Sequence, residues 1–349
     1  MKTFVPALTL LLSAATAVFA QDAKGIKIEN LANADLSLMV NHDPAAEHAS
    51  FDLLPGYEVN LFAAEPMLAN PTHMVWDSRG RLWVTCSWAY PQLKPGQVAN
   101  DKIIILEDTD GDGRADKSTV FADGLYIPTG LELANGGCYV GQSPDLLFLK
   151  DTNGDDVADV REVALTGFGI EDSHHSIHAY RRGPDGWLYF QEGVFLHTQV
   201  ETQHGMVRNF NGGVYQFNPR SGEFRIFAKV NVGNPWGHVF DRWGQSFLVD
   251  NPRVGYLSPS TGNSGERLKL AQLLVTEKQC GGDLASGSHL PEEIRGQLLT
   301  CRFKTRTVVR YEFIEDGAGF NSNVLAPIIS SRHPNFRPID VKIGPDGAI

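Results

Sequence analysis

This sequence of 349 residues lacks several features that often assign a function at once. It has only four cysteines and no C-x-x-C pair, which excludes a zinc ribbon and a c-type haem attachment site within the chain. Its net charge of −11 disfavours nucleic acid and anionic membrane surfaces as main partners. Beyond the N-terminal segment, no apolar run reaches the roughly 18 residues of a spanning helix, so no transmembrane helix is expected.

The first twenty residues have the pattern of a secretory signal peptide. Lys2 supplies a positive start, an apolar stretch follows, and Val18-Phe19-Ala20 resembles a small-residue cleavage site. The mature protein is therefore expected to be periplasmic or secreted. Residues 21–50 are polar and irregular, which predicts an extended N-terminal arm.

The cysteines have two possible states in an oxidising compartment. They are either buried free thiols or disulfides. Cys280–Cys301 is the most plausible disulfide, because these two residues flank a single repeat unit. Both states stay open on the sequence alone.

Glycine is abundant, with 35 residues, and marks a repeat. A polar loop, an apolar strand, a turn with a glycine and a second apolar strand recur at intervals of about fifty residues. The turn glycines are Gly80, Gly137, Gly186, Gly244, Gly296 and Gly347. A single four-stranded unit cannot bury both of its faces, so such units pack in a ring. The repeat thus predicts an all-β fold, a six-bladed β-propeller over residues 51–349.

The sixth copy of the repeat differs from the others in length. It starts at Arg337 and stops at Ile349, where its second strand has barely begun. We therefore expect the last blade to be incomplete and the chain to be a C-terminally truncated fragment.

Two acidic loops resemble part of a calcium-binding loop. Each places carboxylate or amide oxygens at the first, third and fifth positions, as such loops do. Neither match is complete, because Thr119 replaces the bidentate glutamate of the first loop and Asp156 replaces the glycine of the second. The candidate calcium ligands are Asp108, Asp110, Asp112, Asp116, Asp151, Asn153, Asp155 and Glu162. Ordinary strand-connecting turns are the alternative interpretation.

The densest group of histidines lies just before an aromatic strand, in residues 173–190. In a propeller, equivalent loop positions ring one end of the central channel, where ligands bind. Aligning the repeats on their turn glycines places five residues at such positions: Asn70, His175, Asn234, Arg337 and Asp340. His174 and His178 are better explained as hydrogen-bonded channel residues. Trp88 and Tyr90 either stack on a sugar or pack in the core.

The run from His175 to Asp185 resembles the active-site blade of the soluble quinoprotein glucose/sorbosone dehydrogenases. In that six-bladed family, a histidine eight residues before a Gly-Pro-Asp turn is the catalytic base, and this spacing selects His175. The segment NPWG at 234–237 is similar to the family motif Arg-Asn-Pro-x-Gly, with Gly233 in place of the arginine.

Over nearly its whole mature length, the chain also resembles a bacterial family named membrane-bound dehydrogenases. The segments EDTDGDGRADKSTVFADGL, GGDLASGSHLPEEIRG and CRFKTRTVVRYEF carry this resemblance. Members of that family often have a C-x-x-C-H haem domain downstream of the propeller.

The two resemblances imply an exported sugar or alcohol dehydrogenase that depends on pyrroloquinoline quinone (PQQ). His175 is then the base that removes a hydroxyl proton while hydride passes to PQQ. Calcium polarises the quinone, and a downstream haem domain accepts the electrons. The residues implied to bind the cofactor are Asn234, Arg337, Asn70, Asp340 and His178.

Two other functions stay open. A propeller can bind carbohydrate or a protein partner without catalysis, because fold does not settle function. The other is a transition-metal site built from His174, His175, His178 and His238. The spacing of His175 and His178 supports this site only weakly, because a strand directs such side chains to opposite faces.

Overall fold

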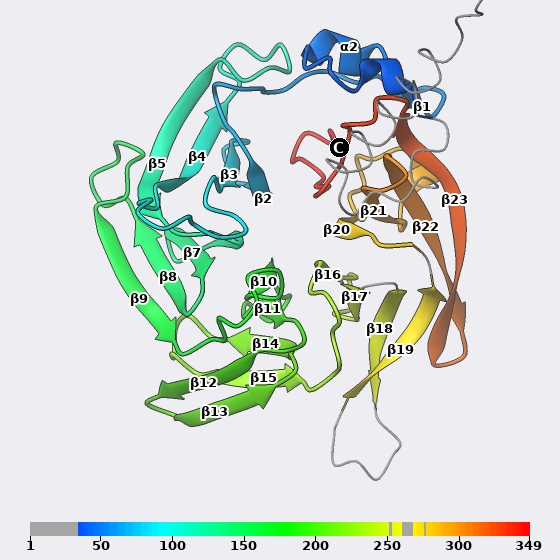
Figure 1. The fold of residues 1–349 in the computed structure, drawn as a ribbon. Helices are drawn as coiled ribbons and strands as arrows, with labels where there is room; N and C mark the ends of the chain where they lie inside the picture. The colour runs from blue at the N-terminus through cyan, green and yellow to red at the C-terminus, as the bar shows by residue number, and fades with distance from the viewer. Residues whose placement is uncertain (1–33, 251–252, 260–267, 276) are drawn as a thin grey trace, which may run out of the picture.

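The computed structural model describes residues 34–250, 253–259, 268–275 and 277–349. In these residues, five antiparallel sheets stand around a common centre as the blades of a β-propeller (Figure 1). The all-β propeller prediction is therefore confirmed. The predicted signal peptide lies outside the described residues. No helix in the described ranges is long and apolar enough to cross a membrane.

The strands of each blade run from the centre outwards in chain order. Blade one has β2 (Pro71–Trp76), β3 (Leu82–Cys86), β4 (Asp101–Glu107) and β5 (Lys117–Leu125). Blade two has β6 (Gly130–Ala134), β7 (Gly137–Gln142), β8 (Asp145–Lys150) and β9 (Val160–Thr166). Blade three has β10 (His178–Arg182), β11 (Leu188–Glu192), β14 (Gly213–Phe217) and β15 (Phe224–Ala228). Blade four has β16 (Gly237–Phe240), β17 (Ser246–Asp250), β18 (Arg253–Pro259) and β19 (Leu268–Val275). Blade five has β20 (Cys280–Leu284), β21 (Leu298–Arg302), β22 (Thr307–Asp316) and β23 (Gly319–Ser331).

A few elements lie outside this four-strand pattern. The short β1 (Phe51–Leu53) adds to the outer edge of blade five by pairing with β23. The hairpin of β12 (His197–Thr202) and β13 (Gly205–Phe210) is inserted between β11 and β14. The short helices are η2 (Leu36–Leu38), α2 (Pro44–His48) and η3 (Glu292–Ile294). The first two belong to the N-terminal arm, and the Asp43 side chain caps α2 by accepting a hydrogen bond from Ala45 N.

The core lies between neighbouring blades. Because both faces of a blade are covered, middle strands such as β3, β11 and β14 are buried along their whole length. Between blades two and three, Phe190 stacks on Tyr180 and Phe224 at ring-centroid separations of 5.3 and 6.1 Å. Burying a side chain such as that of Phe190 stabilises the fold by about 1.5–3 kcal/mol. This packing holds β10 and β11, and with them the histidine loop that precedes β10.

Tight turns join the first two strands of blades one to four, whereas β20 and β21 of blade five are joined by a longer connection that contains η3. Gly80, Gly186 and Gly244 have φ of 78°, 80° and 81°, and each closes its turn through a backbone hydrogen bond. Blade two is different, because Asn135 and Gly136 have φ of 56° and 75° and Gly137 begins β7. A two-residue hairpin turn of this kind requires positive φ at both positions. The glycine predicted for this turn, Gly137, is therefore off by one residue.

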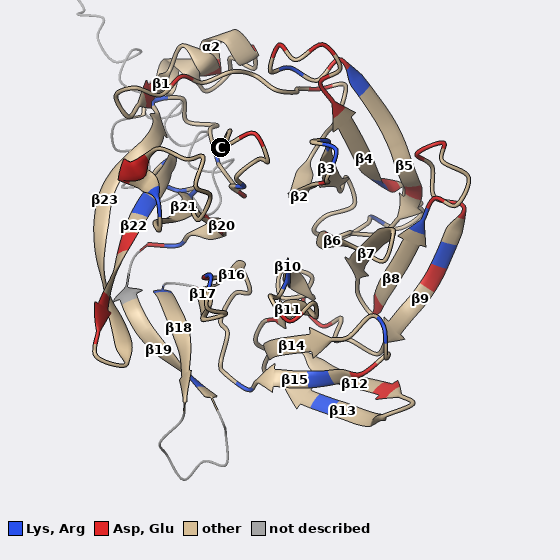
Figure 2. Ribbon diagram, turned by 180° about the vertical axis from the view of Figure 1, so that it is seen from behind, with Lys and Arg blue, Asp and Glu red and all other residues tan. Residues whose placement is uncertain are grey.

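The predicted sixth blade is not confirmed. Residues 332–349 contain no strand, although Gly344 and Gly347 form the expected turn through Gly347 N→Gly344 O and Gly344 N→Ala348 O. A turn needs only these local bonds, whereas a strand needs a ladder to a partner along its length. Both views place this segment inside the ring, between blades five and one (Figures 1 and 2). There Val341 and Ile343 pack on blade five.

Candidate functional site

Two loops at the same end of the ring place His175 and Asn234 in contact. Each residue lies three positions before the innermost strand of its blade, β10 or β16. Asn234 Nδ2 lies 2.8 Å from His175 Nε2. His175 is buried, and the exposed ring of Phe195 covers it at a centroid separation of 5.4 Å. We call His175, Asn234 and the neighbouring Asp172 the mouth group.

The hydrogen bonds of the mouth group assign the proton on His175. Asn234 Nδ2 also lies 2.6 Å from the carbonyl oxygen of Gly233. A carbonyl only accepts, so the atom next to it is the amide nitrogen, which donates to Gly233 and to His175 Nε2. The proton of the neutral ring is therefore on Nδ1, which faces Asp172 Oδ2 at 3.5 Å.

Two opposing effects set the charge of His175. Burial lowers the pKa of His175, and the Asp172 carboxylate raises it, with a net downward shift. His175 is therefore neutral at pH 7, which leaves Nε2 able to accept a proton. Asp172 is poised to stabilise the ring once it is protonated.

A buried carboxylate fixes the loop that carries Asn234. Asp250 Oδ1 accepts a hydrogen bond of 2.7 Å from the Asn234 backbone N–H. Asp250 Oδ2 pairs with Arg253 Nη2 at 2.9 Å, and the same nitrogen donates to the Asn231 carbonyl at 2.5 Å. The connection from β15 to β16 is thus held at two points, which positions the Asn234 amide.

Gly193 allows the two loops of the mouth group to approach. A Cβ at this position would lie 2.9 Å from His175 Cβ and 3.0 Å from Pro235 Cδ. Its backbone N–H donates to the His175 carbonyl at 2.9 Å. A larger residue at 193 would push the His175 and Asn234 loops apart.

A second polar cluster lies deeper, between the innermost strands. Its cavity has a volume of about 20 Å³, roughly the space of one water molecule. His73 Nε2 lies 3.8 Å from Asp340 Oδ2, and His178 Nδ1 donates to the Thr129 carbonyl at 2.6 Å. Lys342 pairs with Asp340 Oδ1 at 3.4 Å. Together with His238 and the ion pair described next, these residues form the axis group.

The axis group contains balanced buried charges. Arg181 donates to Asp283 Oδ1 in a close ion pair. Burial alone would lower the pKa of Arg181, but Asp283 and Glu132 raise it. Burial lowers the pKa of His73 well below its usual value, and it lowers that of His238 to about 3. These histidines stay neutral, and the cavity beside them leaves little room for a ligand, so the axis group is best described as structural.

The residues implied to bind PQQ do not surround one molecule. Asn234 belongs to the mouth group, His178 and Asp340 line the small axis cavity, and Asn70 and Arg337 are exposed. PQQ is a fused-ring quinone with several carboxylates and is much larger than the axis cavity. The predicted set therefore does not fit PQQ as a single site. The expected convergence is found for His175 and Asn234 only.

The four histidines of the transition-metal interpretation do not converge either. His174 is exposed and contacts Asp172, whereas His238 Nε2 lies 2.6 Å from Ser246 Oγ. In the described part of the chain, only three aspartates bring potential metal ligands within 4.8 Å of one another, and they belong to the first acidic loop.

The two acidic loops differ in geometry. In the first loop, Asp108, Asp110 and Asp116 form the group of converging carboxylates, and Asp112 accepts from Arg114 N. In the second, Asp156 pairs with Arg81 at 2.8 Å, which draws this part of the loop towards blade one.

The other candidate calcium ligands of the second loop either accept hydrogen bonds from backbone N–H groups of that loop or lie outside it. Asp151 accepts from Gly154 N, Asn153 accepts from Asp155 N, and Asp155 accepts from Val157 N. Glu162 lies in β9, opposite Phe148. The first loop is therefore the better candidate for calcium.

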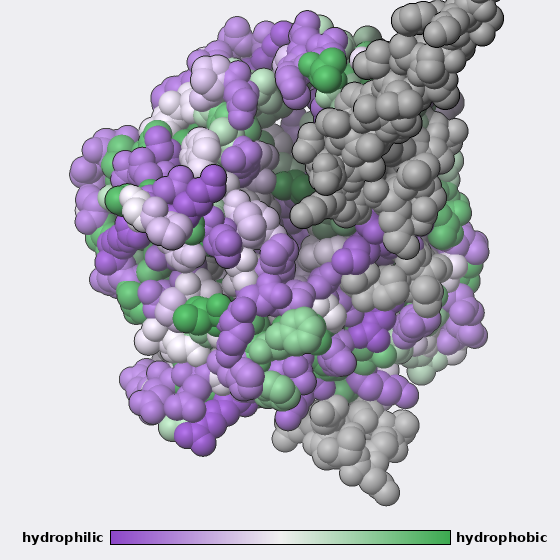
Figure 3. All heavy atoms as spheres, in the orientation of Figure 1, coloured by the Kyte–Doolittle hydropathy of each residue, from purple (hydrophilic) through white to green (hydrophobic). Residues whose placement is uncertain are grey.

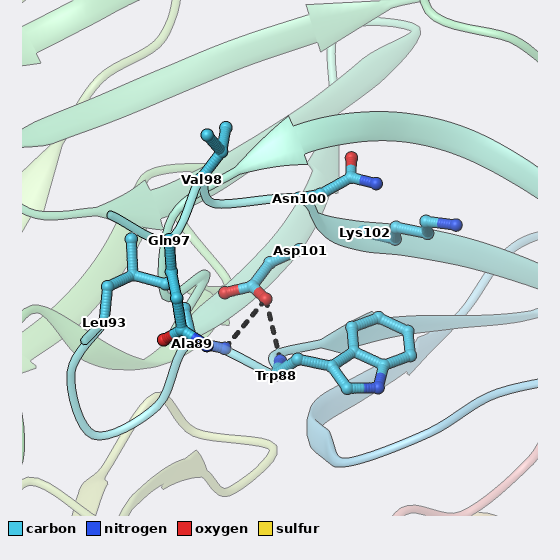
Figure 4. Close-up of a pocket in the computed structure, with 8 residues that line it drawn as sticks. All are labelled: Trp88, Ala89, Leu93, Gln97, Val98, Asn100, Asp101 and Lys102. Atoms are coloured by element: carbon cyan, nitrogen blue, oxygen red, sulfur yellow. Dashed lines mark hydrogen bonds between the residues drawn. The ribbon is translucent and has the colours of Figure 1, made fainter. Parts of the chain in front are cut away.

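Trp88 and Tyr90 are not core residues. The face shown in Figure 3 is mostly hydrophilic among the described residues, with hydrophobic side chains in small groups. Trp88 is 51% exposed and borders a cavity of about 300 Å³ with Asn100 and Lys102 (Figure 4). Asp101 fixes this loop by accepting from Trp88 N and Ala89 N. The 43% exposed Tyr90 contacts the ring of His174, so the loop reaches the mouth group.

The structure settles the pairing of the cysteines. Cys280 and Cys301 face each other across β20 and β21, yet all four cysteines are free thiols. Burial raises the pKa of Cys280 and that of Cys301. The predicted Cys280–Cys301 disulfide is absent, and the alternative of buried thiols describes the structure.

Three residues of the site region were not found from the sequence. Asp172 directly precedes the histidine stretch, and an acid three residues before a histidine was the available signal. Phe195 lies in the turn between β11 and β12, Asp250 is the last residue of β17, and no local pattern marks either of them. Their roles depend on contacts with distant parts of the chain.

Comparisons with known proteins agree with the fold. A structure described as a luciferin-regenerating enzyme is 10% identical, with 80% of this chain and 81% of that chain covered and a TM-score of 0.52. An oxidoreductase described as a glucose dehydrogenase from Thermus thermophilus is 15% identical, covering 80% and 89%, with a TM-score of 0.51. Another glucose dehydrogenase is 14% identical, covering 80% and 91%, with a TM-score of 0.50. At these identities the likeness shows the shared propeller fold alone.

Sequence comparison gives a family without an assigned function. No curated protein matches the chain. The model of one family matches residues 43–279 and 275–349, which together cover most of the sequence. The chain belongs to this family, described as a domain of unknown function (DUF7133).

Proposed function

We propose that this protein oxidises a hydroxyl group of a sugar or another alcohol, with His175 as the base. The observation that carries the proposal is the hydrogen bond from Asn234 Nδ2 to His175 Nε2. It places an N–H donor where a substrate hydroxyl would donate. The opposite ring nitrogen faces Asp172, the orientation that a general base requires.

The proposed step uses the chain's own groups for proton transfer. The substrate hydroxyl replaces the Asn234 amide as the donor to His175 Nε2, and its proton moves to that nitrogen. The C–H bond on the same carbon breaks, a carbonyl forms, and hydride leaves to a two-electron acceptor. Asp172 stabilises the imidazolium that results. General-base catalysis of this kind typically contributes roughly 10²–10⁴-fold in rate.

The resemblance to quinoprotein dehydrogenases suggests PQQ, with calcium, as the acceptor. No step is assigned to PQQ here, because the predicted cofactor residues do not form one site. Export to the periplasm or beyond, and electron transfer to a haem domain on the same polypeptide, are further parts of this proposal. They depend on the sequence patterns alone.

The Trp88 loop supports a sugar as the substrate. An exposed indole beside amide and ammonium groups suits a saccharide, because apolar ring faces stack on it while hydroxyls bond to Asn100 and Lys102. The contact between Tyr90 and His174 brings this surface next to the mouth group.

A non-catalytic carbohydrate-binding propeller is the second candidate. The same bond that supports the first proposal favours this one too, because Asn234 occupies the only acceptor nitrogen of neutral His175. If that bond persists with ligand bound, His175 cannot take a proton.

The test compares His175→Ala with His174→Ala, a neighbouring histidine that is 60% exposed. Oxidation of a panel of sugars and polyols is measured with added PQQ, calcium and a dye acceptor. His175→Ala should lose roughly 10²–10⁴-fold in turnover and His174→Ala much less, with similar melting temperatures. Sugar binding without any turnover by the parent protein would favour the binding propeller. Equal turnover by His175→Ala and the parent would show that His175 is not the base.

A further inference from the structure

A cavity away from the mouth and axis groups lies between blades three and four. Its volume is about 480 Å³, within the range of small-molecule sites. Phe210 and Asn211 border it on the hairpin side, Lys229 and Asn231 on the β15–β16 connection, and Arg253 and Lys269 on blade four. We call this cavity the interblade pocket.

The interblade pocket is basic although the whole chain carries a charge of −11. Its lining contains three cations and no acidic residue. Arg253 is held by Asp250, whereas exposed Lys229 and Lys269 make no ion pair with any described residue. Figure 2 shows basic segments on blade three and on blade four, on either side of the space between them. Two ammonium groups that have no ion pair within the described ranges, beside a held guanidinium, favour an anionic ligand.

The remaining lining residues suit a saccharide ring. Phe210 is 52% exposed, so one face of its ring is open to a ligand. Asn211 Oδ1 accepts from Phe195 N at 3.1 Å, which leaves the amide NH₂ of Asn211 for another acceptor. An open aromatic face with amide donors binds a ring that has an apolar face and hydroxyl edges.

We propose that the interblade pocket binds an acidic saccharide. Its carboxylate or sulfate group pairs with Lys229 and Lys269, and its sugar ring lies on Phe210. The ligand class follows because the pocket offers both cations and an aromatic ring. An inorganic anion would use only the cations, and a neutral sugar would use only the ring. The binding proposal does not require the proposed oxidation to be correct, because none of the lining residues belongs to the mouth group.

The β15–β16 connection links the interblade pocket to the mouth group. The connection that carries Lys229 and Asn231 ends at Asn234, the partner of His175. Arg253 holds its middle through the Asn231 carbonyl, and Asp250 holds its end through Asn234 N. A ligand that draws Arg253 or the connection towards itself therefore acts on the Asn234–His175 contact.

Calorimetric titration at low ionic strength tests the site without any turnover. The probes are D-glucuronate, D-glucose 6-sulfate, D-glucose and sodium sulfate. We expect both acidic sugars to bind at least about tenfold more tightly than either glucose or sulfate. Glucose cannot form the charged hydrogen bonds, and sulfate cannot stack on the aromatic ring. The ratio between the two acidic sugars distinguishes a carboxylate site from a sulfate site. Added salt should weaken the binding of both.

Matched variants then assign the site. Lys229→Gln with Lys269→Gln should lose about tenfold or more in affinity for the acidic sugars. Phe210→Ala should weaken the sugars but not sulfate. Arg220→Gln, which removes an exposed cation from the same blade, should bind as the parent does. Binding of neither acidic sugar, sulfate binding as tight as theirs, or unchanged affinity in the double variant would each overturn the proposal, whatever the outcome of the oxidation assay.

Discussion

The mouth group and the axis group both contain buried histidines, but their surroundings differ. At the mouth, His175 Nε2 faces a side-chain amide, and an exposed aromatic ring covers the histidine. At the axis, His178 is bonded to a backbone carbonyl, and the free volume is about 20 Å³. A histidine can act on a ligand only if one ring nitrogen can exchange its partner for that ligand. Burial alone therefore does not identify the functional histidine of a propeller.

The largest expected effect is a loss of stability, caused by a substitution that removes one charge of the axis group. Asp283→Ala removes the ion-pair partner of Arg181, whose side chain is only 23% exposed. Removing one partner of a buried pair costs about 3–5 kcal/mol, so the free energy of unfolding should fall by that amount. Urea denaturation measures it. His174→Ala near the mouth group is the control, and a loss below about 1 kcal/mol in Asp283→Ala would contradict the description of the axis group as structural.

The pH dependence of stability should also show that the axis group is structural, through its buried histidine His238. The pKa of His238 falls from 6.5 to about 3 on folding. Between these values the unfolded chain binds more protons, so stability rises with pH and is lost as the pH falls below about 6.5, by about 1.4 kcal/mol per pH unit for this residue. His238→Gln should flatten this part of the stability profile. The exposed His204→Gln serves as the control, and equal slopes in both variants would contradict the prediction.

At the mouth group, Asp172→Asn should change the titration of His175 and leave the fold intact. The Asp172 charge raises the pKa of His175, so its removal should move that pKa further down, which NMR of the ring protons can follow. If His175 is the base, the acid limb of the pH–rate profile should move to lower pH as well. The rate should fall about tenfold, because the protonated ring loses the stabilising charge of Asp172. An unchanged His175 titration would show that Asp172 does not act on the ring.

Calcium binding should affect neither group. With calcium at a few times its Kd, the first acidic loop should stabilise the protein by about 1 kcal/mol, and Asp110→Ala should remove this gain. Asp155→Ala in the second loop is the matched control and should keep it. Differential scanning calorimetry measures the shift in Tm. No shift in the parent protein would mean that both loops are plain turns.

Much of the fold could be predicted from the sequence because its signals are local. Apolar strands and turn glycines specify hairpins wherever they occur, so blades one to five appear where the repeat places them. The same locality explains the errors. The turn at Gly344–Gly347 forms from its own hydrogen bonds, but a sixth blade needs ladder partners that a repeat count does not supply.

The candidate site was predictable only in part for a similar reason. Aligning loops on turn glycines gives the angular position of a residue around the ring, and this brought His175 and Asn234 together. It does not give depth along the axis or the direction of a side chain, so His178 and Asp340 were placed with residues that they do not contact. Asp250 was missed because it meets its partners Asn234 and Arg253 only in the folded structure.

The pairing of β1 with β23 has a consequence for the dynamics of the ring. Phe51 is opposite Ser331, so this short ladder joins segments 280 residues apart, with Ser50 and Ser331 bonded through their hydroxyls at 2.7 Å. A strand of three residues has few bonds to lose, so it can detach at a small fraction of the free energy of global unfolding. The amide protons of β1 should therefore exchange with solvent through local opening. Those of β21 and β22 should exchange only when the whole blade unfolds. When β1 detaches, the end of β23 that it covers, Ile329–Ser331, becomes available to another strand, which lengthens the edge along which two copies of the chain can pair.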